Sequence, residues 1–115
     1  MIFIIDDDEI MGECIANYCN QKTQIFHNAI EAMNAISDGN IPDLIFLDIL
    51  LDGPDGFTFL HELASYNDTA KIPVVVVSSI NFAGQDLSIY GVVGVLNKDN
   101  MMPEDVKQYV NKFTA

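Results

Sequence analysis

At 115 residues, half of them hydrophobic, the chain predicts one folded domain over residues 1–115, and this composition argues against disorder. Its 17 acidic residues face five lysines and no arginine, and a net charge of −12 repels phosphate backbones, so nucleic-acid binding is not expected. No apolar run approaches the roughly 20 residues that span a bilayer, and no basic segment suggests a secretory signal. With two cysteines expected to stay reduced, Cys14 and Cys19, these features favour a cytoplasmic protein without membrane partners.

Short runs rich in β-branched residues alternate with helical patterns along the chain. Strands are expected over residues 1–5, 24–27, 44–47, 74–77 and 92–96. Helices are expected between them, where apolar residues recur at three- and four-residue spacing: on Met11, Cys14, Ile15 and Tyr18; on Ala29, Ala32, Met33 and Ile36; on Phe57, Leu60, Leu63 and Ala64; and on Val106, Tyr109, Val110 and Phe113. The alternation predicts an α/β fold, with a doubly wound parallel sheet.

Helix boundaries carry their own signals. Asn28 is a plausible cap for the second helix, and Pro103 suits the first turn of the last. Asp8 and Glu9 are expected to complement the amino end of the first helix dipole. The segment 81–90 is the least regular of the helical patterns, because its apolar positions lack clean periodicity.

Polar residues stand where four of the strands end. Asp6 and Asp7 follow the first strand, Asp48 the third, Ser78 the fourth, and Lys98 comes shortly after the fifth. In open α/β sheets the carboxyl ends of the strands form the binding edge, so these side chains are expected to converge. Carboxylates, a hydroxyl and one lysine together predict a pocket for a divalent cation and a phosphoryl group.

In this order and spacing, the residues resemble the receiver domain of two-component response regulators, of the stand-alone chemotaxis or sporulation-relay kind. The resemblance covers essentially the whole chain and rests on the acidic pair, the third-strand aspartate and the positions matched after it: Asp6, Asp7, Asp48, Asp55, Gly56, Ser78, Gly91, Gly94 and Lys98. It implies a flavodoxin-like sheet of five parallel strands in the order 2-1-3-4-5, with helices on both faces.

The same resemblance implies roles for the site residues. Asp48 would accept a phosphoryl group from a histidine kinase or histidine phosphotransfer protein, in a self-catalysed reaction that needs Mg²⁺. Asp7, Asp48 and the backbone carbonyl of Leu50 would ligate Mg²⁺ directly, with Asp6 acting through water. The resemblance also gives Lys98 a contact to a phosphoryl oxygen, and Ser78 a hydrogen bond to another. A downstream protein target would read the phosphorylated state.

Departures from the family pattern concern regulation. Val95 stands where an aromatic residue is usual, and Asp52 and Asp99 stand where prolines are usual. The span from Ser78 to Lys98 is also shorter than typical, by about two residues. We therefore expect a trans Lys98–Asp99 peptide bond, because a cis bond before a non-proline residue is costly. We also expect a weak conformational response to phosphorylation.

Two alternatives belong to other classes of protein. One is a phosphorylation-independent adaptor that keeps the acidic cluster as a structural metal site. The other is a phosphatase of the haloacid-dehalogenase type, which also has a nucleophilic aspartate after a strand. That class needs a second acid two residues later, where this chain has Leu50.

Overall fold

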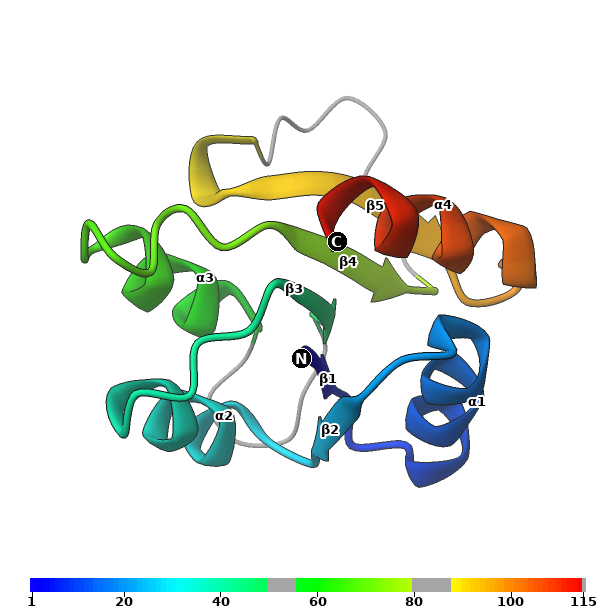
Figure 1. Cartoon of the computed structure of the whole chain (residues 1–115), viewed down its shortest axis with the longest axis horizontal. Coiled ribbons are helices and arrows are strands. Elements are labelled where there is room, and N and C mark those ends of the chain that lie inside the picture. Colours follow the sequence, from blue (N-terminus) through cyan, green and yellow to red (C-terminus); the bar gives the residue numbers. More distant parts are fainter. Residues whose placement is uncertain (50–55, 80–87, 115) are drawn as a thin grey trace.

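The computed structural model describes residues 1–49, 56–79 and 88–114. These residues form one sheet of five parallel strands, arranged in the order β2-β1-β3-β4-β5 (Figure 1). The strands are β1 (Ile2–Ile5), β2 (Thr23–Phe26), β3 (Leu44–Asp48), β4 (Val74–Ser78) and β5 (Val92–Asn97). The predicted fold class and strand order are confirmed, and each strand lies within about two residues of its predicted range.

Helices cover both faces of the sheet. They are α1 (Glu9–Cys19), α2 (Ala29–Ser37), α3 (Gly56–Ala64) and α4 (Pro103–Phe113), with a short 3₁₀ helix, η1 (Ser88–Tyr90), before β5. The cores show that α1 and α4 pack on one face, and α2 and α3 on the other (Figure 1). No helix in the described part of the chain combines the length and apolar character needed to cross a membrane.

Central strands are buried on both faces, as the run of four valines predicts. On β1, Phe3 and Ile5 pack beneath α2 and α3, whereas Ile2 and Ile4 pack beneath α1 and α4. The same alternation continues along β3 and β4, because successive side chains of a strand point to opposite faces. The sheet therefore separates two hydrophobic cores and is held rigidly between them.

The predicted caps are present. Asn28 accepts a hydrogen bond from the Glu31 amide at 2.9 Å, and Pro103 occupies the first turn of α4. Asp8 caps α1 through its side chain, which accepts from the amides of Ile10 and Met11 at 3.1 and 3.2 Å. The two cysteines are free, Cys19 buried and Cys14 partly exposed, as expected for reduced packing residues.

The predicted core face of α3 is partly wrong. Ala64 is exposed, and the buried residues of this helix are Gly56, Phe59, Leu60 and Leu63. The helix turns Phe59 toward the sheet, and Phe57 is only half-buried. Of the helix expected over residues 81–90, the described portion contains only η1, and residues 80–87 lie outside the described residues.

Candidate metal and phosphoacceptor site

Strand pairing brings the predicted polar residues to one edge of the sheet. Ile5 of β1 pairs with Leu47 of β3, so the next residues, Asp6 and Asp48, follow neighbouring strand positions. In turn, Asp48 pairs with Val77 of β4. Ser78 then pairs with Asn97, one residue before Lys98. Parallel pairing in register thus places β1, β3, β4 and β5 with their polar ends together.

Three carboxylates gather at this edge. Asp6, Asp7 and Asp48 each offer an oxygen, and these oxygens lie within 4.8 Å of one another. Asp6 and Asp48 are buried, with 1% and 5% of their surfaces exposed, while Asp7 faces solvent. Two carboxylates are thus fixed inside the protein, and the third lies on its surface.

The backbone holds Asp6 in place. Its amide donates to the Phe26 carbonyl at 3.0 Å, and its Oδ1 accepts a hydrogen bond from the Asp8 amide at 2.8 Å. Asp8 also caps α1 through its own carboxylate, so one short segment joins the site to that helix. Our sequence interpretation gave Asp8 a role at the helix end and missed its bond to Asp6. A polar side chain two residues before a capping aspartate is the signal that could have indicated it.

Lys98 is the cation of the cluster. Its Nζ lies 3.1 Å from Oδ2 of Asp6 and 3.1 Å from Oδ2 of Asp48. The Lys98 amide donates to the Ser78 carbonyl at 3.1 Å, which anchors the lysine beside the end of β4. Among the described residues, one ammonium faces three carboxylates, so the ionised cluster has an excess of two negative charges (three minus one).

This environment shifts two pKa values. Burial raises the pKa of Asp6, and the charge of Asp48 adds to the increase, although the Asp8 amide and Lys98 oppose it. Burial alone would lower the pKa of Lys98, but its hydrogen bond to Asp48 and its pairing with Asp6 outweigh that effect, and the pKa is raised. The lysine therefore stays charged, whereas the ionised form of Asp6 is held at a cost.

One buried oxygen fits a metal ligand or a bridging water. Oδ2 of Asp6 is buried, and among the described residues its charged partner is the Lys98 ammonium, whose Nζ lies 3.1 Å away. A hard divalent cation prefers oxygen ligands of this kind. The donor set and the excess negative charge therefore fit Mg²⁺.

Of the other predicted site residues, the structure describes Ser78 but not Leu50. Ser78 is buried at the end of β4, between β3, which ends in Asp48, and β5, which Lys98 follows. Leu50, the predicted carbonyl ligand, lies outside the described residues, as do Asp52 and Asp55.

Gly56 follows that segment and fits closely against Ile49, the residue after β3. Its amide donates to the Ile49 carbonyl at 3.0 Å, and a Cβ at Gly56 would lie 2.7 Å from the Ile49 Cα.

The loop after Lys98 differs from the family pattern in the way expected. The Lys98–Asp99 peptide bond is trans, as predicted. The Asp99 amide, which a proline would lack, donates to Oδ1 of Asn97 at 2.8 Å and forms a tight turn. On β5, Val95 is 41% exposed and carries no ring.

Comparison with known proteins identifies the class. The family profile of the response regulator receiver domain matches residues 2–111. The chain belongs to this family, which decides against the phosphatase alternative.

Among solved structures, the receiver domain of NtrX from Brucella abortus aligns with a TM-score of 0.82 at 24% identity, over 97% of this chain and 96% of that one. The receiver domain of sensor histidine kinase PA1611 from Pseudomonas aeruginosa, with a magnesium ion coordinated in its active site cleft, gives a TM-score of 0.80 at 14% identity, over 97% and 94%. These likenesses support the fold.

Curated relatives are longer proteins. Response regulator PleD from Caulobacter vibrioides is 31% identical over 72% of this chain and 19% of its own length. Protein-glutamate methylesterase/protein-glutamine glutaminase 2 from Oleidesulfovibrio alaskensis is 24% identical over 96% of this chain and 32% of its own length. The chain thus spans a third or less of the length of these relatives.

Proposed function

We propose that residues 1–115 act as one phosphoaccepting receiver unit, which takes a phosphoryl group onto Asp48 from a histidine kinase or histidine phosphotransfer protein. The observation that carries the proposal is the cluster of Asp6, Asp7 and Asp48 around Lys98 at the carboxyl edge of the sheet. Family membership supplies the reaction type. The proposal includes the cytoplasmic location expected from the sequence.

Each residue has a role in this chemistry. An oxygen of the Asp48 carboxylate forms a bond to phosphorus as the phosphorus–nitrogen bond of the donor phosphohistidine breaks, and the imidazole leaves with the electron pair. Lys98, already 3.1 Å from Oδ2 of Asp48, is placed to pair with a phosphoryl oxygen on that side chain. Ser78 supplies a hydroxyl for a second oxygen. Lys98 and the buried position of Asp48 hold the nucleophile in one orientation.

Mg²⁺ would be held by Asp7, Asp48 and the Leu50 carbonyl, with Asp6 bound through a water molecule. When bound, it neutralises charge on the transferring phosphoryl group. Asp6, which is buried beside Lys98, would orient that water and help to balance the charge of the ion. Mg²⁺ and Lys98 together would offset the negative charge of the three carboxylates.

The partner that donates the phosphoryl group is proposed from the family. Receivers occur within histidine kinases themselves, as in PA1611, whose receiver shares this fold. This chain would then relay the group or signal by docking to a further protein. A net charge of −12 argues that neither partner surface is strongly acidic.

Mass spectrometry after incubation with acetyl phosphate and Mg²⁺ tests the proposal. We expect the gain of one phosphoryl group, no gain in EDTA, and no gain in Asp48→Asn. Lys98→Ala should react more slowly, because it removes the cation beside the nucleophile. Unmodified protein under every condition, with both acetyl phosphate and phosphoramidate, would support the adaptor alternative. Labelling of the Asp48→Asn variant would contradict the choice of Asp48.

A further inference from the structure

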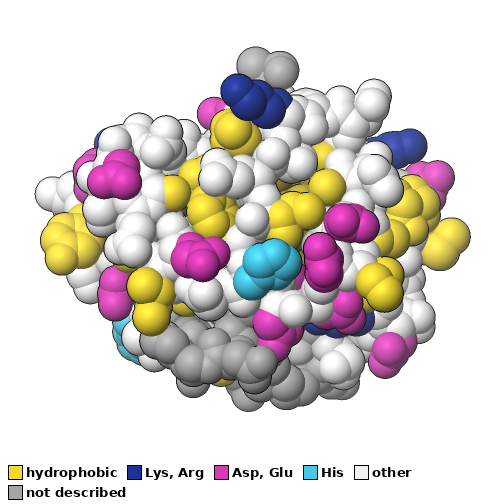
Figure 2. Space-filling model, turned by 90° about the horizontal axis from the view of Figure 1, so that it is seen from below, with side chains coloured by type: hydrophobic (Ala, Val, Ile, Leu, Met, Phe, Trp, Pro, Cys, Tyr) yellow, Lys and Arg dark blue, Asp and Glu magenta, His cyan; other side chains and the backbone are white. Residues whose placement is uncertain are grey.

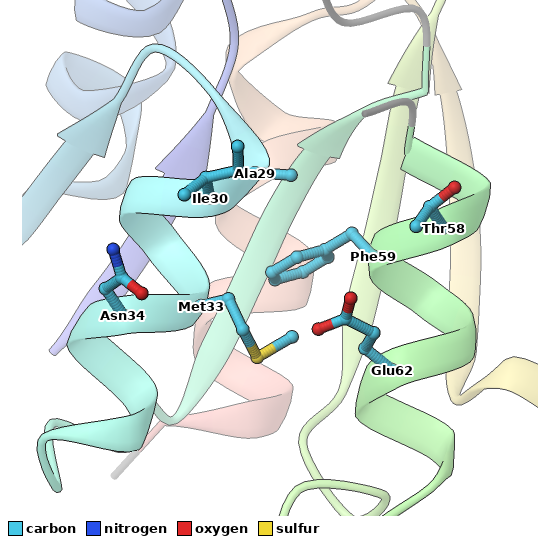
Figure 3. Close-up of a pocket in the computed structure, with 7 residues that line it drawn as sticks. All are labelled: Ala29, Ile30, Met33, Asn34, Thr58, Phe59 and Glu62. Atoms are coloured by element: carbon cyan, nitrogen blue, oxygen red, sulfur yellow. The ribbon is translucent and has the colours of Figure 1, made fainter. Parts of the chain in front are cut away.

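A groove separates α2 from α3 on the face of the molecule that these helices cover. It consists of two hollows, of about 250 and about 390 Å³, which share Met33 and Glu62 in their walls. Figure 3 shows Met33 of α2 extending toward Phe59 and Glu62 of α3 across the first hollow. The nine residues of α2 give the groove a length of roughly 13 Å, enough for about two turns of a helix.

The floor of the groove is apolar and its rims are exposed. Phe59 lies at the base of the first hollow and Ile36 at that of the second, each more than 95% buried in the core below. Ile30, on the rim of the first hollow, and Tyr66, on that of the second, are 54% and 62% exposed. Apolar side chains on both rims indicate an occupant larger than a small metabolite, with apolar groups of its own.

The charged side chains that line the groove are acidic. Glu62 lines both hollows and Asp68 lines the second. No lysine lines either hollow in the described part of the chain. Other parts of the molecule are also acidic: acidic side chains outnumber lysines on the face shown in Figure 2, which is the lower side of Figure 1, and the whole chain carries −12. A second copy of this chain would bring the same charge and be repelled.

The wall at the end of α3 is already rigid. The buried hydroxyl of Thr69 donates to the Leu63 carbonyl at 2.6 Å, and the Ala70 amide donates to the Tyr66 carbonyl at 2.8 Å. These bonds fix the turn that carries Tyr66 and Asp68. The groove thus requires little ordering to receive a partner, which lowers the entropic cost of binding.

We propose that the α2–α3 groove is a docking site for a short basic amphipathic segment of a partner protein. The segment would place one or two large apolar side chains over Met33 and Phe59, and lysine or arginine beside Glu62 and Asp68. The groove is separate from the acidic site and is lined by none of its residues, so this inference does not depend on phosphorylation.

A designed peptide provides the test. It is a helix-forming probe of about 12 residues, with leucine at positions spaced by three and four and lysine elsewhere. Fluorescence polarisation measures its affinity, and backbone amide NMR shifts map where it binds. We expect shifts concentrated on α2 and α3. A scrambled peptide of the same composition should bind more weakly, as should one with glutamate in place of lysine.

Substitutions separate docking in the groove from general attraction to an acidic protein. Glu62→Gln and Met33→Gln should each weaken binding about three- to fivefold, whereas Glu13→Gln, the same charge change as Glu62→Gln at an exposed position of α1, should leave it within about twofold. Glu62 and Glu13 are both exposed, so neither change threatens folding. The proposal would be overturned if Glu62→Gln and Glu13→Gln weakened binding equally, or if the scrambled peptide bound as tightly as the designed one. Amide shifts located outside α2 and α3 would overturn it as well. A self-associated protein that Met33→Gln makes monomeric would overturn it too, by identifying a second copy as the occupant.

Discussion

At the scale of single residues, Asp6 is the most constrained group of the site. It is buried, bonded to the Asp8 amide and paired with Lys98. Its pKa is raised above the ordinary 3.8, chiefly by burial. A carboxyl with a raised pKa stabilises the folded state in its protonated form, below the unfolded pKa, and this contribution is lost as the pH rises through the folded value. The metal-free protein therefore carries a destabilising charge at neutral pH.

Replacing Asp6 with asparagine should raise the free energy of unfolding of the metal-free protein at pH 7. The amide oxygen of the new side chain can still accept the hydrogen bond from Asp8, while the buried charge is gone. The advantage over the native chain should shrink as the pH falls through the raised pKa of Asp6 and should be lost below the ordinary value of 3.8. Urea unfolding in EDTA at a series of pH values measures the difference in free energy of unfolding between the variant and the native chain. Glu13→Gln is the control for the change in net charge. A less stable Asp6→Asn variant at pH 7 would mean that pairing with Lys98 outweighs burial.

Asp7 offers a cleaner test of the metal, because it is exposed and contributes little to packing. If Mg²⁺ binds the folded cluster and not the unfolded chain, a concentration of 100 times Kd should stabilise the native protein by about 2.7 kcal/mol. Asp7→Ala should remove most of that gain and leave the metal-free melting temperature nearly unchanged. Thermal melts with MgCl₂, and with NaCl of equal ionic strength, distinguish binding from screening. The same Mg²⁺-induced shift in Asp7→Ala would exclude Asp7 as a ligand.

At the scale of elements, Gly56 shows how closely the start of α3 fits against Ile49, the residue that follows β3. A Cβ at this position would lie 2.7 Å from the Ile49 Cα and 3.0 Å from its carbonyl oxygen, and backbone atoms cannot move aside cheaply. We expect Gly56→Ala to destabilise the fold by about 1–3 kcal/mol, the usual cost of overpacking. Chemical denaturation measures this difference.

Gly12 on α1 is the matched control. A Cβ there would meet the Ile25 Cγ2 methyl at 3.2 Å, a side-chain contact that can adjust, and alanine favours the helix by about 1 kcal/mol. Gly12→Ala should therefore be neutral or stabilising. Equal effects at the two glycines would show that the close approach to Ile49 has no special cost.

The central strands are predicted most directly, because their burial is uniform. The central strands are apolar on both faces, so they need no periodicity to be recognised, and parallel pairing then brings Asp6, Asp48 and Lys98 to one edge. The core face of α3 was predicted partly wrong because Phe57 and Phe59 compete for it, and only packing against the sheet decides that Phe59 is buried. The α2–α3 groove depends on the separation of two helices, which no local pattern encodes.

At the scale of the whole molecule, we expect phosphorylation to change this receiver only modestly. Val95 stands partly exposed on β5 without a ring, and the side chain of valine is stiff at χ1. A modification can shift a conformational equilibrium only through different interactions with its two states. The segment after Ser79, where Ile80 and Phe82 are expected to change environment, lies outside the described residues.

Amide NMR shifts with and without beryllofluoride, a phosphoryl mimic, test this expectation. They should stay near Asp48, Lys98 and the start of α1, which the Asp8 hydrogen bond joins to the site. Asp48→Asn should abolish them. Large shifts through β5 and α4 would show that the conformational response is strong despite Val95.

The strand order has a consequence for where such a site can exist at all. From β1 the chain crosses to β2 by way of α1 on one face, whereas from β3 it crosses to β4 by way of α3 on the other. The connections that leave these two adjacent strands therefore diverge, and a crevice opens above their carboxyl ends wherever a sheet reverses its winding direction. Asp6 and Asp48 are the first side chains at that divide. The topology of the sheet thus determines where the site lies, and the residues at that position determine only what the crevice binds.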